Sequence, residues 1–298
     1  MSFVKISCAW LYVITKYGYP PSIEDTIRAF EEIAKMGFTA AEVEAVGEKN
    51  LDEVIGNKDK IKKTVGDLGV RIVNLVPVFP DIVSFDKERR KRAKLNFEKA
   101  ADVASYLGCD TIQLDSYFPP VQVNGDIPYE NQIEFAMRVN AAIPIGFQWE
   151  DFWHVLVDTV GWCADIAQRE GLRLCVEPRV GESVSNTDAM LMLLRDVGSS
   201  NLGVVFDTAH LFAQKEILAL SIAKLKDKIF YVHASDNDGK ENLHLGLGKG
   251  AIDWDNIILT LQQVGYKGYI GIDIGNVPDI EYEMIKSREY LEKILGAK

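Results

Sequence analysis

Residues 202–235 read LGVVFDTAHLFAQKEILALSIAKLKDKIFYVHAS, and this stretch decides the fold. Its two apolar runs, 202–207 and 229–235, predict strands that are buried on both faces, as in a parallel sheet. Between them, residues 215–226 place apolar side chains at helical spacing. The stretch therefore predicts a strand–helix–strand unit with parallel strands, which require a crossover of this kind.

The same alternation continues in both directions along the 298 residues. Eight strands alternating with eight helices is the pattern of a closed (β/α)8 barrel. The sequence therefore predicts a single α/β TIM barrel domain over residues 1–298. The predicted strands cover residues 3–10, 40–46, 70–79, 111–117, 173–178, 202–207, 229–235 and 269–275, and the predicted helices cover 22–37, 50–69, 86–108, 151–171, 187–197, 215–226, 254–265 and 281–295.

A doubly wound open sheet of eight strands is the alternative architecture. Such a sheet normally carries a glycine-rich phosphate turn after its first strand, whereas this chain has Cys8-Ala9-Trp10-Leu11-Tyr12 there. No stretch rich in Pro, Gly or Ser divides the chain into two parts. The closed barrel is therefore favoured.

One connection is unusually long. About thirty residues separate Tyr117, at the end of the fourth strand, from Asp151, at the start of the fourth helix, whereas such loops usually have ~2–6 residues. In a barrel this loop lies on the C-terminal face, where active sites form. It is either a lid or substrate wall, or a surface excursion or oligomer contact.

The composition narrows the classes of partner. With 33 basic and 44 acidic residues the formal charge is −11, which repels nucleic-acid backbones and anionic lipid and argues against both as partners. No window approaches the ~18 apolar residues of a membrane span. The four cysteines form no CxxC pair, and the N-terminus has no signal-peptide pattern. We expect a cytoplasmic, reduced protein, although a disulfide between distant cysteines stays open.

Ionisable side chains end four consecutive predicted strands: Glu177, Asp207, His233 and Asp273. Consecutive barrel strands are neighbours, so these groups should form an arc at one rim, where catalytic residues of barrels lie. Three carboxylates this close repel one another, and one divalent metal ion is the simplest way to keep them ionised. Oxygen ligands with one imidazole favour Mn²⁺, Mg²⁺ or Co²⁺, with Zn²⁺ as an alternative.

Further side chains near the predicted rim are candidates for binding substrate. Arg179 follows the fifth strand, His210 lies three residues after Asp207, and His244 lies in the glycine-rich loop 242–250. Such loops let backbone N–H groups approach a ligand. Asp115 and Trp10 complete this set, and Phe79, Tyr117 and Trp149 are further candidate apolar walls; His154, within a predicted helix, is interpreted as structural or surface.

The motifs over the C-terminal half carry a resemblance to a known family. They are Val176-Glu177-Pro178, Phe206-Asp207-Thr208-Ala209-His210, Val232-His233-Ala234-Ser235-Asp236, the 244–250 loop with Ile252-Asp253-Trp254 after it, and Gly271-Ile272-Asp273. In order and spacing they resemble the xylose isomerase-like TIM barrel superfamily of sugar isomerases and epimerases. The N-terminal half agrees mainly in its strand rhythm.

This resemblance implies roles for the strand-end residues. Glu177, Asp207 and His233 would bind one divalent metal ion, and Asp273 stands where the family usually has a Glu ligand. Asp273 is one methylene shorter, which bears on whether it reaches both metal and substrate. In the family's ketose epimerases the acids at these two positions form the acid/base pair, so Glu177 and Asp273 are the expected catalytic residues.

We expect a metal-dependent isomerase or epimerase of a small sugar or related hydroxy-ketone, with a carbohydrate as its partner. A dehydratase of an inosose-like polyol ketone and a non-catalytic sugar-binding barrel are the alternatives. The family's trinuclear-zinc abasic-site endonucleases are disfavoured, because strands three and four offer no histidine and Asn242 stands at the position of a required Asp. A homodimer or homotetramer would be usual for such families. The substrate, and whether it carries phosphate, stay open.

Overall fold

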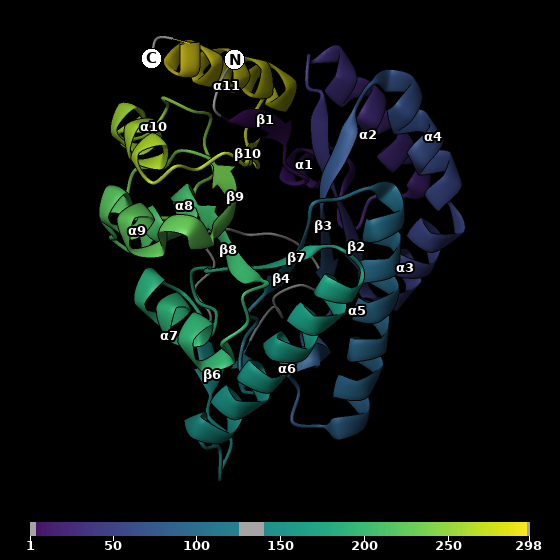
Figure 1. The fold of residues 1–298 in the computed structure, drawn as a ribbon, viewed down its shortest axis with the longest axis vertical. Coiled ribbons are helices and arrows are strands. Elements are labelled where there is room, and N and C mark those ends of the chain that lie inside the picture. Colours follow the sequence, from purple (N-terminus) through teal and green to yellow (C-terminus); the bar gives the residue numbers. More distant parts are fainter. Residues whose placement is uncertain (1–3, 125–139, 297–298) are drawn as a thin grey trace.

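The computed structural model describes residues 4–124 and 140–296. Its centre is a closed barrel of parallel strands in the order β1-β10-β9-β8-β7-β4-β3-β2, as Figure 1 shows. Strand β10 closes the ring against β1. The predicted TIM barrel is confirmed. The strands are β1 (Lys5–Cys8), β2 (Ala40–Val46), β3 (Arg71–Val78), β4 (Thr111–Asp115), β7 (Arg173–Glu177), β8 (Leu202–Asp207), β9 (Ile229–Ala234) and β10 (Tyr269–Ile272).

Helices surround this barrel on its outer side (Figure 1). They bury one face each against the strands, which places the main apolar core between the two layers. The helices are α1 (Leu11–Tyr17), α2 (Ile23–Lys35), α3 (Gly47–Gly56), α4 (Lys58–Leu68), α5 (Lys87–Leu107), α6 (Trp149–Arg169), α7 (Thr187–Val197), α8 (Thr208–Ala213), α9 (Leu218–Leu225), α10 (Trp254–Gln263) and α11 (Ile280–Gly296), with 3-10 turns at Pro80–Val83 and Lys226–Lys228.

Two predicted helix starts are confirmed in their capping contacts. The Ser22 hydroxyl accepts the backbone N–H of Asp25 at the start of α2. The Asp86 carboxylate accepts the N–H groups of Glu88 and Arg89 at the start of α5. Each side chain satisfies donors that the first helical turn leaves without an intrahelical partner.

The structure differs from the predicted elements at two places. The predicted helix 50–69 is two helices, α3 and α4, because the Asn57 side chain donates to the carbonyl of Glu53 at 2.8 Å and competes with the helical backbone. The predicted first strand is shorter than 3–10, since Trp10 already stands at the start of α1. Its first residue, Phe3, lies outside the described residues.

A rung of apolar side chains fills the barrel interior beneath the polar strand ends. It consists of Ala40, Val73, Cys175, Val205 and Tyr231. Residues two apart in a strand point to the same side. Four members of this rung are followed, two positions nearer the strand's carboxyl end, by an ionisable residue that also points inward: Glu42, Glu177, Asp207 and His233.

The long connection after β4 contains a small two-stranded antiparallel sheet. Strand β5 (Gln122–Asn124) pairs with β6 (Asn140–Ala142). Most of these strand residues are exposed to solvent. The middle of the connection, residues 125–139, lies outside the described residues, so its role as a lid or as a surface excursion stays a prediction.

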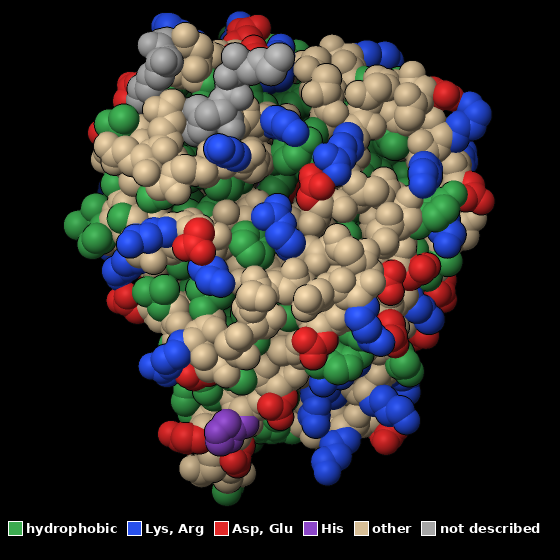
Figure 2. Space-filling model, viewed as in Figure 1, with side chains coloured by type: hydrophobic (Ala, Val, Ile, Leu, Met, Phe, Trp, Pro, Cys, Tyr) green, Lys and Arg blue, Asp and Glu red, His purple; other side chains and the backbone are tan. Residues whose placement is uncertain are grey.

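The state of the cysteines and the apolarity of the helices agree with the expectations drawn from composition. All four cysteines are buried and free, and no described helix is both long and apolar enough to cross a membrane. Figure 2 shows Lys and Arg side chains interspersed with Asp and Glu on one face of the molecule. On that face the net negative charge is not gathered into one patch.

The buried Asp236 organises the loop after β9, which carries His244. Its carboxylate accepts four hydrogen bonds, from the backbone N–H groups of Asn237, Gly248 and Ile252 and from the indole of Trp254, at 2.9–3.1 Å. Position 250 must be glycine, because a Cβ there would lie 2.3 Å from the carbonyl oxygen of Asn237.

We predict that Asp236→Asn destabilises the protein. The new amide would point its own N–H groups at two backbone or indole donors, which lowers the free energy of unfolding by about 2–3 kcal/mol. Urea denaturation measures the loss. The matched control is Asp238→Asn in the same loop, where the side chain is exposed and the amide oxygen can still accept the Lys240 and Glu241 N–H groups. Equal midpoints for the two variants would contradict the role of Asp236.

Candidate functional site

The imidazole of His233 lies at the centre of the polar strand ends. Its Nε2 is 2.9 Å from a carboxylate oxygen of Glu42 on β2, and its Nδ1 is 2.6 Å from a carboxylate oxygen of Glu177 on β7. The Nδ1 atom is also 3.8 Å from Oδ2 of Asp207 and 4.0 Å from Oδ2 of Asp273. The structure therefore brings the other three predicted metal-binding residues, Glu177, Asp207 and Asp273, within 4.0 Å of Nδ1 of His233.

Charge is crowded and shielded from water at this point. Burial, together with repulsion by Glu177 and Asp273, raises the pKa of the Asp207 carboxyl to about 7. Burial disfavours a charged His233, yet Glu42, Glu177 and Asp273 outweigh it and raise the pKa of His233 well above its ordinary value. The positive charge of a protonated His233 offsets part of the negative charge of these carboxylates. A bound metal cation would offset it in the same way.

Asp207 supplies an observation that tests the fit of a metal ion. Its Oδ1 accepts the backbone N–H of His210 at 2.8 Å, whereas its Oδ2 is buried and has no hydrogen-bond partner among the described residues. Potential ligand atoms of Glu177, Asp207 and His233 all lie within 4.8 Å of one another. Two carboxylates and an imidazole with a free acceptor oxygen are a donor set that suits a divalent ion, so these residues fit one.

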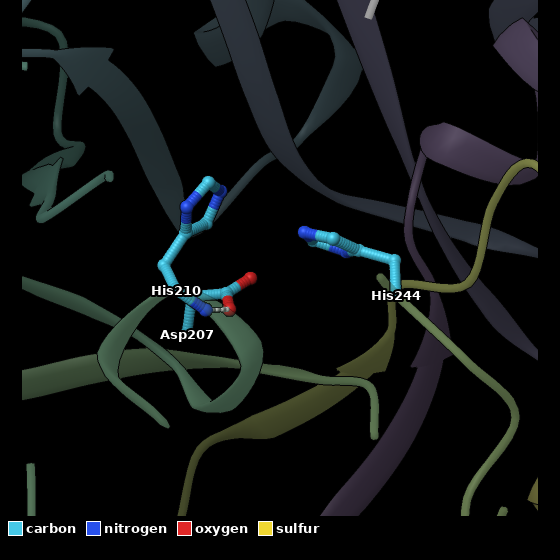
Figure 3. A group of neighbouring side chains, drawn as sticks. All are labelled: Asp207, His210 and His244. Carbon is cyan, nitrogen blue, oxygen red and sulfur yellow. Dashed lines mark hydrogen bonds between the residues drawn. The ribbon is translucent and has the colours of Figure 1, made fainter. Parts of the chain in front are cut away.

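A second group of potential ligands shares Asp207 and is drawn in Figure 3. Ligand atoms of Asp207, His210 and His244 also lie within 4.8 Å of one another. The two imidazole rings face each other edge to face, with centroids 5.2 Å apart. The Asn242 amide nitrogen lies 3.1 Å from Nδ1 of His210 and 3.1 Å from Nε2 of His244, so it bridges the two rings.

Asp273, the residue that is one methylene shorter than the family's usual Glu, is held by His244. The Nδ1 atom of His244 is 3.1 Å from Oδ2 of Asp273 and 2.9 Å from its backbone oxygen. Burial disfavours the charged carboxyl, but His233 and His244 outweigh it and keep the pKa of Asp273 below its ordinary value. Asp273 is therefore a carboxylate that reaches toward both groups of potential ligands.

Arg179 and Asp115 lie together on the Glu177 side of the site. The Arg179 Nη1 donates to Asp115 Oδ2 at 2.8 Å, and its Nε is 3.7 Å from Glu177 Oε2.

The imidazole of His210 is neutral. Burial, followed by the repulsion of Arg179, lowers the pKa of His210 well below its ordinary value. The predicted substrate-binding residues Asp115, Arg179, His210 and His244 thus surround the predicted metal ligands.

The candidate aromatic walls contact the protein's own core. The Trp10 ring is only 2% exposed and lies 5.6 Å from the ring of Phe30 on α2, while its backbone N–H donates to Glu42. Trp149 stacks on Trp153 within α6. Tyr117 donates to a backbone carbonyl of β3 and accepts the N–H of Phe79, and His154 is exposed on α6 as expected. The contact of these aromatic rings with substrate stays a prediction.

Sequence reasoning missed Glu42, Asn74 and Gln113. Asn74 donates to Gln113, and Gln113 donates to Glu177, both at 3.1 Å, while Asn74 also lies 3.4 Å from Glu42. This chain of hydrogen bonds orients the carboxylates on both sides of His233. The signal that could have found it is the sequence AAEVEAV of 40–46, which places acids at alternate positions of a strand that should be buried on both faces.

Comparison with known proteins identifies the family. The family model for xylose isomerase-like TIM barrels matches residues 30–294, so the chain belongs to this family.

The individual relatives within the family share 25–27% of their aligned residues with this chain. The chain is 27% identical to hydroxypyruvate isomerase of Escherichia coli K12 over 136 residues, which cover 44% of this chain and 51% of that protein. It is 26% identical to inosose dehydratase of Clostridium beijerinckii over 168 residues, 49% of this chain and 56% of that protein. The D-psicose 3-epimerase of Agrobacterium fabrum is 25% identical over 80% of this chain and 76% of its own length. The chain thus spans about half the length of the first two relatives.

Among solved structures, a D-tagatose 3-epimerase-like protein superimposes with a TM-score of 0.75. It is 22% identical and covers 99% of this chain and 98% of its own. At this identity the likeness establishes the fold, and the chemistry has to be argued from the site.

We predict that Glu42→Gln destabilises the protein by about 2–4 kcal/mol, because it removes one member of a buried, hydrogen-bonded ion pair with His233 and turns an N–H₂ group toward other donors. Thermal and urea denaturation of protein treated with a chelator measure this change. The matched control, Glu48→Gln, changes an exposed residue of α3 and should leave the unfolding midpoint where it is. A Glu42→Gln midpoint equal to that of wild type would contradict the pairing.

Proposed function

We propose that the protein is a divalent-metal-dependent isomerase or epimerase of a small sugar or related hydroxy-ketone. The observation that carries the proposal is the convergence of Glu177, Asp207 and His233 at the carboxyl end of the barrel, with one buried oxygen of Asp207 lacking a partner in the described part of the chain. The isomerases and epimerases among its relatives support the same reaction class.

In this proposal Glu177, Asp207 and His233 hold the metal ion, and Asp273 is the fourth ligand. Mn²⁺, Mg²⁺ or Co²⁺ suits the oxygen-rich donor set, and Zn²⁺ is the alternative. When bound, such an ion polarises the carbonyl and adjacent hydroxyl oxygens of a substrate, which makes the C–H bond between them more acidic.

The protein's own acids would move the proton. Glu177 and Asp273 end strands that are separated by β8 and β9 in the barrel, so they approach His233 from two sides. One carboxylate takes the proton from the carbon beside the carbonyl. Return of a proton to the opposite face of that carbon gives an epimer. Return of the proton to the former carbonyl carbon, with a second proton passed from the hydroxyl oxygen to the former carbonyl oxygen, gives the isomer.

The surrounding polar residues would bind and orient the substrate. His210 and Arg179 are assigned to its oxygens. Because Nδ1 of His210 accepts the backbone N–H of Val180 at 3.2 Å, the neutral ring carries its proton on Nε2 and can donate from there. His244 would hold Asp273 as well as a substrate hydroxyl. Asp115 accepts from Arg179 and so fixes that guanidinium, and Trp10 is the candidate for an apolar wall.

Dehydration is the second candidate, because an inosose dehydratase is among the relatives. It shares the first step, since a proton leaves the carbon beside the carbonyl before a β-hydroxyl departs as water. A sugar-binding barrel without catalysis would share only the binding groups.

We predict that the metal-loaded protein exchanges deuterium into a ketose in D₂O at the carbon beside the carbonyl, with no loss of water. Glu177→Gln should lower this rate at least ~100-fold, because general acid–base catalysis contributes about 10²–10⁴. Mass spectrometry and NMR follow the exchange, and Glu98→Gln on the exposed side of α5 is the matched control. Loss of water would indicate the dehydratase, and binding without exchange the non-catalytic barrel.

We also predict about one tightly bound divalent ion per chain, because ligand groups that are brought together by folding bind such ions. Metal analysis after dialysis against Mn²⁺ measures this. His233→Gln should lose the ion, whereas His210→Gln should keep it, because His210 belongs only to the second group of potential ligands. The opposite pattern would assign the ion to Asp207, His210 and His244, and absence of any ion would contradict the mechanism.

A further inference from the structure

Two acids lie one rung nearer the barrel mouth than the residues around His233. Glu44 follows Glu42 by two positions on β2, and Asp115 follows Gln113 by two positions on β4. Because Glu42 and Gln113 contact groups inside the barrel, Glu44 and Asp115 point to the same interior. Neither acid belongs to a group of potential metal ligands found among the described residues.

The two acids are close enough to influence each other. Burial raises the pKa of Glu44 well above its ordinary value, and Asp115 is the next largest cause. Burial likewise raises the pKa of Tyr19, with Glu44 and Asp115 adding to it and Arg179 opposing. Glu44 and Asp115 therefore lie within electrostatic range of each other, and Arg179 joins this pair through its hydrogen bond to Asp115.

Each acid has an acceptor oxygen without a donor in the described structure. Oδ2 of Asp115 accepts from Arg179, but its Oδ1 is buried and has no partner, although the residue is only 2% exposed. Oε2 of Glu44 is also buried and without a partner. A buried carboxyl oxygen without a hydrogen-bond partner is costly. One such oxygen on each of two inward-pointing acids therefore points to a ligand that brings hydrogen-bond donors.

We infer that Glu44 and Asp115 form an acceptor subsite for hydroxyl groups at the end of the substrate that does not react, so that the protein acts on uncharged polyhydroxy ketones. This inference rests on the proposed function. Arg179 links the subsite to the reacting end, since its guanidinium contacts Asp115 at 2.8 Å and lies 3.7 Å from Glu177. A terminal phosphate or carboxylate would meet the acids Asp115, Glu177 and Glu182, which all lie within 4 Å of this one guanidinium and outnumber it.

The test measures binding by calorimetry and deuterium exchange by NMR on the metal-loaded protein. The probes are a six-carbon ketose, its terminal phosphate ester, and dihydroxyacetone, which has no hydroxyls beyond the reacting end. Glu44→Ala should weaken binding of the six-carbon ketose and raise its KM by about tenfold or more. The same substitution should leave the binding and the KM of dihydroxyacetone nearly unchanged. Glu48→Ala, an exposed neighbour on α3, should change neither.

The outcomes separate the inference from the proposed function. If wild type neither binds nor exchanges any ketose, the proposed function fails. If wild type exchanges ketoses but Glu44→Ala affects both lengths equally, or the phosphate ester binds more tightly than the free ketose, only the inference is overturned. Asp115→Leu, and Glu44→Met if the Ala variant does not fold, repeat the comparison with the side-chain size kept and the acceptor oxygens removed. The same length-dependent effect is expected.

Discussion

His233 lies between Glu42 and Glu177 inside the barrel, with each ring nitrogen within 3 Å of a carboxylate oxygen. A buried charge is tolerated only when it is paired and hydrogen-bonded, so this arrangement constrains everything around it. Asn74 and Gln113 link the two carboxylates through further hydrogen bonds. Below them the barrel is filled by the apolar rung, which consists of Ala40, Val73, Cys175, Val205 and Tyr231. The site is therefore held by the interior of the barrel and does not depend on loops for its central residues.

Loops bring the second half of the site. His244 reaches the strand ends because Asp236 fixes the loop after β9 through hydrogen bonds to the backbone and to Trp254. His244 then holds Asp273, and Asn242 connects it to His210. In this way the shorter acid at position 273 has a partner of its own, and its carboxylate stays within 4.0 Å of His233.

Part of the acidic excess behind the formal charge of −11 lies at the barrel mouth. Glu42, Glu44, Asp115, Glu177, Asp207 and Asp273 all carry carboxyl groups into the interior or its rim, facing one arginine and two imidazoles of raised pKa. Such a field favours a cation and hydroxyl-bearing ligands over anions. Both proposals, the metal ion near Asp207 and the hydroxyl subsite at Glu44, follow from this imbalance.

The sequence by itself determined the barrel, because runs buried on both faces and helices with capping residues such as Ser22 and Asp86 are local patterns. It also located Glu177, Asp207, His233 and Asp273, since a polar residue at the end of an apolar strand is visible without a partner. Only the tertiary structure decided which groups pair. Glu42 is 191 positions from His233 in the chain, and a strand register is needed to bring them together. The burial of Trp10 against Phe30 likewise depends on contacts that a one-dimensional pattern does not contain, because a side chain's packing is set by neighbours in space.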